Sequence, residues 1–179
     1  MNQLLRGKYR DIITTAKGTV QWKSGWRSNL IVDKCSVLLA ALMKQDEAMG
    51  GILYWAVGEG QKEWDLQAPA PSLTISQLTK EVYRQSINVA QIIYIDQNEQ
   101  PSQTATDRLE VTMEISGEDI ISDGFQSLRE FGLFGGDATV NPNSGLMIDY
   151  VIHPRIDLTS STRLLRTVQL TFTTGIPEQ

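Results

Sequence analysis

The segment that most limits the possible folds of this chain is Arg108–Ser116, where apolar and polar side chains alternate. Its apolar residues, Leu109 through Ile115 at every second position, would face a core, and Glu110, Thr112 and Glu114 would face solvent. This two-residue period is that of a half-buried β-strand. Val168–Phe172 repeats the pattern near the end of the chain. Other apolar or alternating runs bounded by turn residues predict strands within 17–27, 52–57, 86–96, 125–134 and 146–153.

One segment has a helical period instead. Cys35, Leu38, Leu39 and Leu42 follow the i, i+3, i+4, i+7 spacing of a single buried helix face. Asp33 precedes this run as a candidate N-cap, and Gly50-Gly51 lies beyond it as a stop. These signals predict a helix at about residues 33–45.

About seven strands around one early helix predict a mainly β fold, an antiparallel β-sandwich with the N-terminal helix packed on it. The sequence contains no internal repeat and no low-complexity linker. We therefore expect residues 1–179 to form a single domain. Within it we expect a basic N-terminal arm at 1–17, the sandwich with its helix at 18–173, and a short tail at 174–179.

Composition excludes several classes of chemistry. The chain has 179 residues with one cysteine and one histidine, so neither an internal disulfide nor the usual zinc spacings can form. Cys35 lies on the apolar helix face, and His153 precedes a proline at a strand end, which favours structural roles for both. We expect no catalytic, metal or cofactor residues. No apolar run is long enough for a membrane span, and the N-terminus lacks the apolar core of a secretory signal.

Two chemical alternatives stay open on acidic residues. Carboxylates at Glu59 and Glu63, at Glu118 and Asp119, and at Asp123 could act as a glycosidase pair or hold calcium, although no EF-hand spacing is present. Gly58 and Gly60 follow a predicted strand but lack the third glycine of a dinucleotide site. A glycan hydrolase is therefore the enzymatic alternative, and the sequence favours a protein that is not an enzyme.

Charge is distributed unevenly along the chain. Residues 1–34 contain seven Lys or Arg and two Asp or Glu, whereas residues 35–150 contain six and seventeen. This predicts that a basic arm docks on an acidic neighbour. The arm cations are Arg6, Lys8, Arg10, Lys17, Lys23 and Arg27. A sequence pI near 4.9 argues against nucleic acid as the partner.

Three tryptophans, Trp22, Trp26 and Trp64, flank turns and charged residues, whereas the apolar neighbours of Trp55 predict burial. Exposed tryptophans often anchor protein interfaces or stack on sugars. These three are therefore candidates for an interface or for a carbohydrate-binding surface.

Four motifs, taken in order, resemble a known pattern. Ser28–Val32 leads into the helix, Ala56-Val-Gly-Glu-Gly60 follows it, and Leu78-Thr-Lys-Glu-Val-Tyr-Arg84 and Arg129-Glu-Phe-Gly-Leu-Phe134 come later. Their order and spacing resemble the N-terminal, particle-proximal domain of bacteriophage tail-collar and tail-fibre proteins. Similar domains occur in baseplate and tail components of phage-tail-like contractile injection systems. The resemblance covers about residues 18–172.

The resemblance implies a non-enzymatic structural subunit, because the pattern contains no catalytic residue. It implies other tail, baseplate or fibre proteins as partners, a homo-oligomer, and a place in a virion or tail-like particle assembled in the bacterial cytoplasm. The chain ends at Gln179 without shaft repeats, so a collar, fibre-adaptor or baseplate-peripheral component is expected. The alternative is a carbohydrate- or receptor-binding module at a fibre or particle tip. Neither nucleic-acid binding nor membrane insertion is expected.

Overall fold

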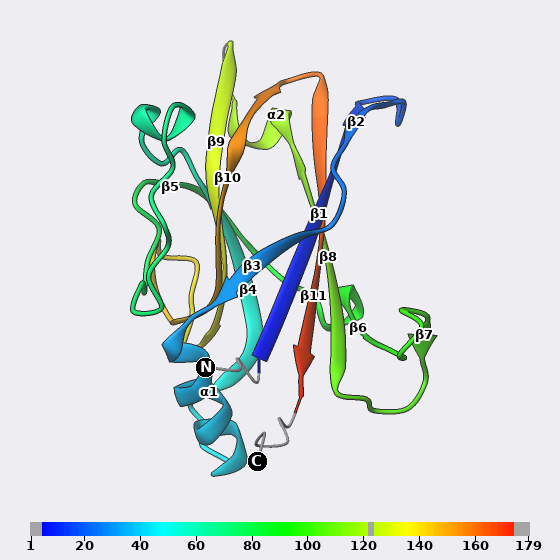
Figure 1. The fold of residues 1–179 in the computed structure, drawn as a ribbon, viewed down its shortest axis with the longest axis vertical. Coiled ribbons are helices and arrows are strands. Elements are labelled where there is room, and N and C mark those ends of the chain that lie inside the picture. Colours follow the sequence, from blue (N-terminus) through cyan, green and yellow to red (C-terminus); the bar gives the residue numbers. More distant parts are fainter. Residues whose placement is uncertain (1–4, 122–123, 174–179) are drawn as a thin grey trace.

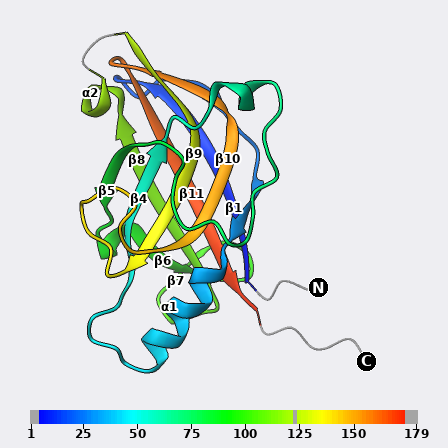
Figure 2. The ribbon, with the colours of Figure 1, turned by 90° about the vertical axis from the view of Figure 1, so that its left-hand side faces the viewer.

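The computed structural model describes residues 5–121 and 124–173 and is mainly β (Figure 1). Every pair of neighbouring strands is antiparallel, and the strands form one continuous path in the order β5-β4-β9-β10-β3-β1-β11-β8-β6-β7. The path folds into two layers that face each other (Figure 2). The predicted mainly β, sandwich-like class is thus confirmed.

The strands divide between the layers as follows. The first layer contains β5 (Glu81–Ser86), β4 (Gly50–Gly58), β9 (Phe125–Gly136) and β10 (Leu146–Thr159). The second contains β1 (Leu5–Thr15), β11 (Thr162–Phe172), β8 (Arg108–Ser116), β6 (Ile92–Ile95) and β7 (Pro101–Ser102). The short strand β3 (Arg27–Ile31) pairs with β10 and with β1 and so joins the layers, while β2 (Val20–Lys23) pairs only with β1.

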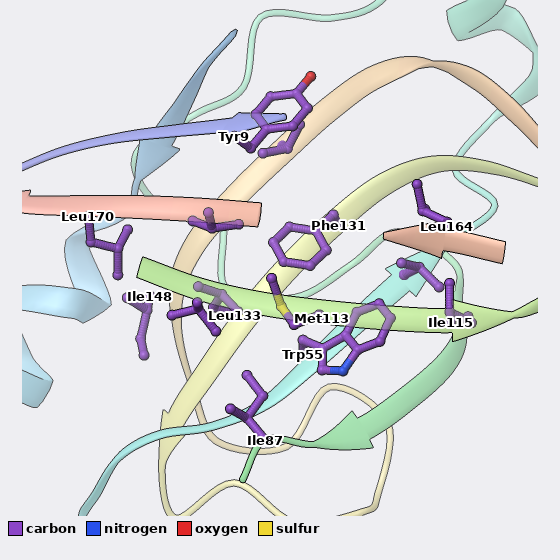
Figure 3. Packing of buried hydrophobic residues seen from close by; sticks show 14 of the residues in the cluster. Tyr9, Trp55, Ile87, Met113, Ile115, Phe131, Leu133, Ile148, Leu164 and Leu170 are labelled. Atoms are coloured by element: carbon purple, nitrogen blue, oxygen red, sulfur yellow. The ribbon is translucent and has the colours of Figure 1, made fainter. Parts of the chain in front are cut away.

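The core lies between the two layers (Figure 3). Trp55 of β4 and Phe131 of β9 meet Met113 of β8 and Leu170 of β11 there, and each is almost wholly buried. Strand β8 has the bounds that the alternation predicts, with Val111, Met113 and Ile115 in the core, Leu109 half-buried and Glu114 exposed. Burial of large apolar side chains, each contributing about 1.5–3 kcal/mol, is the main stabilising term.

Helix α1 (Asp33–Met43) lies at one end of the sandwich (Figure 1), where it packs mainly against β10. Cys35 and Leu38 are buried as predicted, but Leu42 is 38% exposed. The prediction that Asp33 caps the helix was wrong. Val32 occupies the N-cap position without a side-chain hydrogen bond, and Asp33 is the first helical residue, where its negative charge favours the helix N-terminus.

The largest correction concerns the N-terminal arm. Residues 5–15 are not an arm outside the sandwich but strand β1, paired along its whole length with β11. Tyr9 and Asp11 face inward, and a buried Asp11 interrupts the apolar alternation by which a strand is normally identified. Residues 1–4 of the expected arm, the expected tail at 174–179, and Asp123 lie outside the described residues.

The segment predicted as one strand at 86–96 is divided. Strand β5 ends at Ser86, a 3₁₀ turn at Val89–Gln91 follows, and β6 begins at Ile92. Asn88 starts this turn by accepting a hydrogen bond from the backbone N–H of Ala90. The remaining short helices are η1 (Lys62–Asp65) and α2 (Gly117–Ile120).

Candidate functional site

Glu130, the glutamate of the Arg129–Phe134 motif, is wholly buried and holds a loop in place through hydrogen bonds. Glu130 accepts hydrogen bonds from the backbone N–H groups of Thr79 and Lys80, at 3.0 and 2.8 Å, and from the Tyr150 hydroxyl at 3.0 Å. A Cβ on Gly58 would lie 2.4 Å from Glu130 Oε1, so glycine leaves room for the carboxylate. Glu130 and its three donors, here called the Glu130 cluster, thus fasten the loop before β5 to β9.

The glutamate and arginine of the Leu78–Arg84 motif form a second buried pair. Arg84 Nε and Nη2 donate to the Glu81 carboxylate at 2.7 and 3.0 Å, and the guanidinium lies 4.1 Å from the centre of the Phe134 ring. Glu81 also accepts from the backbone N–H of Asn143 at 2.8 Å. Both motifs are therefore occupied in tying loops to the first layer.

A bulge in β10 creates a different kind of region. Ile152 pairs with Glu130 and Ile156 pairs with Leu128, so the three residues His153–Arg155 stand opposite Arg129 alone. Proline lacks a backbone donor, and Pro154 fits such a bulge. The two layers also separate here. Beyond the residues that pair with β3, strand β1 pairs with β2, whereas this part of β10 pairs only with β9. The bulge therefore lies where the sheet splits.

Three hollows meet at this bulge, and all three include Arg155 in their walls. Their volumes are about 250, 460 and 390 Å³. Trp22 lines the first and Trp64 lines the second, with His153 and Pro154 shared between these two. The fold thus gathers two of the three tryptophans singled out in the sequence around one arginine, and we refer to these hollows as the Arg155 site.

Four charged groups of the Arg155 site are paired with one another. Arg155 donates to Asp157 at 2.7 Å and lies 3.6 Å from Asp65, which also receives a two-pronged hydrogen bond from Arg129 at 2.7 and 2.8 Å. The Arg129 guanidinium holds the pKa of Asp65 below its ordinary value. Ser127 donates to Asp157 at 2.6 Å. The arrangement fixes several donors and acceptors at the surface.

Beneath the site lies a buried ionic pair. Arg166 donates from Nε and Nη2 to Asp11 at 2.6 and 2.7 Å. Burial opposes ionisation of Asp11, but the adjacent Arg166 outweighs it, so the pKa of this carboxyl is lowered. Burial and the Arg166 charge lower the pKa of His153 to about 3, so its imidazole is neutral. Its Nδ1 lies 2.9 Å from the Pro154 carbonyl and must carry the proton.

Three of the predicted arm cations form a separate surface on β1, whereas Lys17 lies in the turn after β1, Lys23 on β2 and Arg27 on β3. Arg6, Lys8 and Arg10 alternate with the inward side chains, and here they are called the basic row. Trp26 lies beneath it, with its ring centre 4.5 Å from Lys8 Nζ and 4.7 Å from Arg10 Cζ. Lys8 forms an ion pair with Glu99, whereas neither Arg6 nor Arg10 forms an ion pair with a described residue. The candidate interface residues therefore form two groups. The basic row lies with Trp26, and Trp22 and Trp64 lie at the Arg155 site.

Of the other carboxylates considered from the sequence, Glu59 and Asp119 have structural partners, and Glu63 and Glu118 are exposed. Glu59 pairs with Lys80, and Asp119 closes the first turn of α2 by accepting from the backbone N–H of Ser116. Among residues 5–121 and 124–173, no group of three potential ligands is placed to hold a metal ion. No helix in that part of the chain is both long enough and apolar enough to cross a membrane.

Sequence reasoning missed Arg155, Asp65 and Asp157 as members of a site. The one available signal was Pro154 directly after an apolar strand segment, which marks a strand end or a bulge. The chain matches no protein-family model, no curated protein and no solved structure.

Proposed function

We propose that this chain is a non-enzymatic structural subunit of a phage tail or phage-tail-like contractile injection particle, as a collar, fibre-adaptor or baseplate-peripheral component. The order of the four motifs supports this, and so does the use of their charged side chains in fastening loops to a rigid frame. The protein would act through interfaces with copies of itself and with other tail, baseplate or fibre proteins. It would be assembled in the bacterial cytoplasm and would need no cofactor.

The observation that carries the proposal is the basic row. Arg6 and Arg10 are exposed on a strand that β11 holds along its full length, so they can bind without the entropic cost of ordering an arm. A hollow of about 510 Å³ adjoins the row, and its wall includes Arg6 and Lys8 together with Ser28, Asn29 and other residues. Carboxylates of an acidic neighbouring subunit match this surface in charge, and such charge complementarity mainly sets specificity and association rate.

Charge reversal tests the proposal. The double variant Arg6→Glu with Arg10→Glu leaves the Lys8–Glu99 pair intact and removes both cations without an internal ion pair. We expect most of the tagged variant to disappear from the megadalton fraction when lysate of the native cells is sedimented through a sucrose gradient. Wild-type protein should sediment there together with sheath and tube proteins.

A variant with the same change in charge provides the control. Lys34 and Lys44 are exposed on α1 and at its C-cap, outside β1, and Lys34→Glu with Lys44→Glu should leave sedimentation unchanged. Undiminished incorporation of the Arg6/Arg10 variant would refute docking through the basic row. Wild-type protein that stays at the top of the gradient would refute the particle assignment itself.

A further inference from the structure

We propose that the Arg155 site binds a neutral oligosaccharide, with Trp22 and Trp64 as the surfaces on which sugar rings stack. This proposal uses a different surface from the basic row and does not depend on the chain belonging to a tail particle. It is the more specific form of the carbohydrate-binding alternative, since it names the groove, the contacts and the charge of the ligand.

The shape of the site fits a chain of similar units. Three hollows of about 250, 460 and 390 Å³ adjoin one another through Arg155, and a tryptophan borders each of the first two. Ligand pockets for a single compact molecule are usually one cleft or cavity of about 300–1,000 Å³ that encloses most of the ligand. Several shallow hollows in contact suit successive rings of an oligosaccharide instead.

The exposed tryptophan needs a partner that is apolar on one side and polar on the other. Trp22 is 43% exposed on β2, a strand whose four side chains all face solvent. An indole ring offers a large flat apolar face at low cost in conformational entropy. A sugar ring has C–H groups on a face and hydroxyl groups around its edge, so it can cover the indole and still reach the neighbouring charges.

The charges of the site select a ligand without net charge. The walls of the three hollows contain four cations and four anions: Arg27, Lys62, Arg129 and Arg155 with Asp11, Glu59, Asp65 and Asp157. An anionic polymer would be repelled by Asp65 and Asp157, and a cationic one by Arg155. Hydroxyl groups both donate and accept, so they can use arginine N–H groups and aspartate oxygens alike.

Arg155 is the central polar contact. Its guanidinium is already held by Asp157 and approached by Asp65, and its side chain is nevertheless half exposed. A donor group fixed in this way loses little freedom when a ligand binds, and that improves affinity. The ligand would therefore find both stacking surfaces and hydrogen-bonding groups in place.

Titration with defined oligosaccharides tests the proposal. Maltohexaose, cellohexaose and hexa-N-acetylchitohexaose would each be added to millimolar concentration, and binding would be followed by tryptophan fluorescence and by isothermal titration calorimetry. We expect saturable binding of at least one of them. Trp22→Ala and Trp64→Ala should each weaken that binding about tenfold, which corresponds to about 1.4 kcal/mol.

Trp26 supplies a matched control, because it lies under the basic row and lines none of the three hollows. Trp26→Ala should bind the sugar as the wild type does. Absence of binding to all three sugars would overturn the proposal, and so would undiminished binding by a folded Trp22→Ala/Trp64→Ala variant. Neither result would affect sedimentation with particles, so the two proposals can fail separately.

Discussion

The Glu130 cluster and the Arg155 site are built from neighbouring residues of β9 and β10, yet they differ in solvation. Glu130 has no exposed surface, and its carboxylate accepts hydrogen bonds from two backbone N–H groups and a tyrosine hydroxyl. Arg155 points its charge into three open hollows and shares Asp65 with Arg129. A buried carboxylate that is hydrogen-bonded within the protein can only stabilise the fold. An exposed guanidinium that is held in place by ion pairs can also contact a ligand.

The difference begins with one step in the strand pairing. Glu130 pairs in register with Ile152, but the next residues of β10 leave the register as a bulge opposite Arg129. Tyr150 and Val151, before the bulge, are buried, whereas Arg155, the last residue of the bulge, is turned to solvent. Bulges commonly redirect side chains at the edges of sheets and beside functional sites.

The largest effect is expected from Glu130→Ala. The change leaves the N–H groups of Thr79 and Lys80 and the Tyr150 hydroxyl without their acceptor, and hydrogen bonds to a charged group contribute about 1.5–3 kcal/mol each. We expect the free energy of unfolding to fall by about 5 kcal/mol in urea titrations.

Glu114→Ala is the matched control, since Glu114 is an exposed strand glutamate with a single ion pair to Arg163 at 3.3 Å. Its loss should cost less than about 1 kcal/mol. Equal effects of the two substitutions would contradict the distinction between a saturated buried carboxylate and a surface one.

Regular periodicity explains which elements could be predicted. Strand β8 and helix α1 follow uninterrupted patterns, so their positions were evident in the sequence. Strand β1 was missed because Asp11 faces the core, and its partner Arg166 lies 155 residues later in the chain. Nothing local in the sequence reveals that a charge is neutralised at such a separation.

The candidate site was predictable only in its parts. Trp22 and Trp64 stood out because they flank turns, but their meeting at Arg155 depends on how β9, β10 and β2 are paired. A bulge is set by the register between two strands, and a single strand sequence does not contain that register. For the same reason Asp65 and Asp157, which hold Arg155 from η1 and β10, carried no signal of their own.

Asp149 of β10 is a buried carboxyl group, and its titration gives the second prediction. Burial raises the pKa of its carboxyl to about 7 from an ordinary value of 3.8, even though the Asn29 side chain donates to it. Between these two values the folded protein binds a proton that the unfolded chain has lost. Asp149 therefore makes the protein less stable as pH rises through this window.

His153 acts in the opposite direction. Its pKa is about 3 in the folded protein and 6.5 ordinarily, so below pH 6.5 the unfolded chain binds a proton that the folded imidazole does not. Stability from His153 is lost as pH falls through this range. The two contributions oppose each other from about pH 4 to 6.5, and their combined effect on stability there is small.

Asp149→Asn should separate them. At about pH 8 the variant should be more stable than the wild type by up to about 4 kcal/mol, because the buried negative charge is gone. As pH falls from about 7 to about 4 its advantage should shrink steadily, because the wild-type carboxyl takes up a proton. Urea titrations of both proteins across this range give the comparison, and a variant less stable than the wild type at pH 8 would contradict the assignment.

The smallest effect on stability is expected from Arg155→Ala, and it decides whether the comparison holds. Arg155 and Arg129 both contact Asp65, but the Arg129 side chain is buried and that of Arg155 is half exposed. Exposed ion pairs contribute little to stability, whereas truncating a buried arginine leaves its acceptors without a donor and removes its packing. Urea unfolding should thus place Arg155→Ala close to the wild type and Arg129→Ala clearly below it.

Arg155→Ala should nevertheless weaken oligosaccharide binding, because Arg155 is in the wall of all three hollows. A small change in stability together with a clear change in binding is what distinguishes a surface group from a part of the frame. If Arg155→Ala destabilised the protein as strongly as Arg129→Ala, the contacts of Arg155 with Asp65 and Asp157 would be contacts that stabilise the fold. The bulge in β10 would then serve to connect the two layers where they separate, and not to expose the Arg155 side chain.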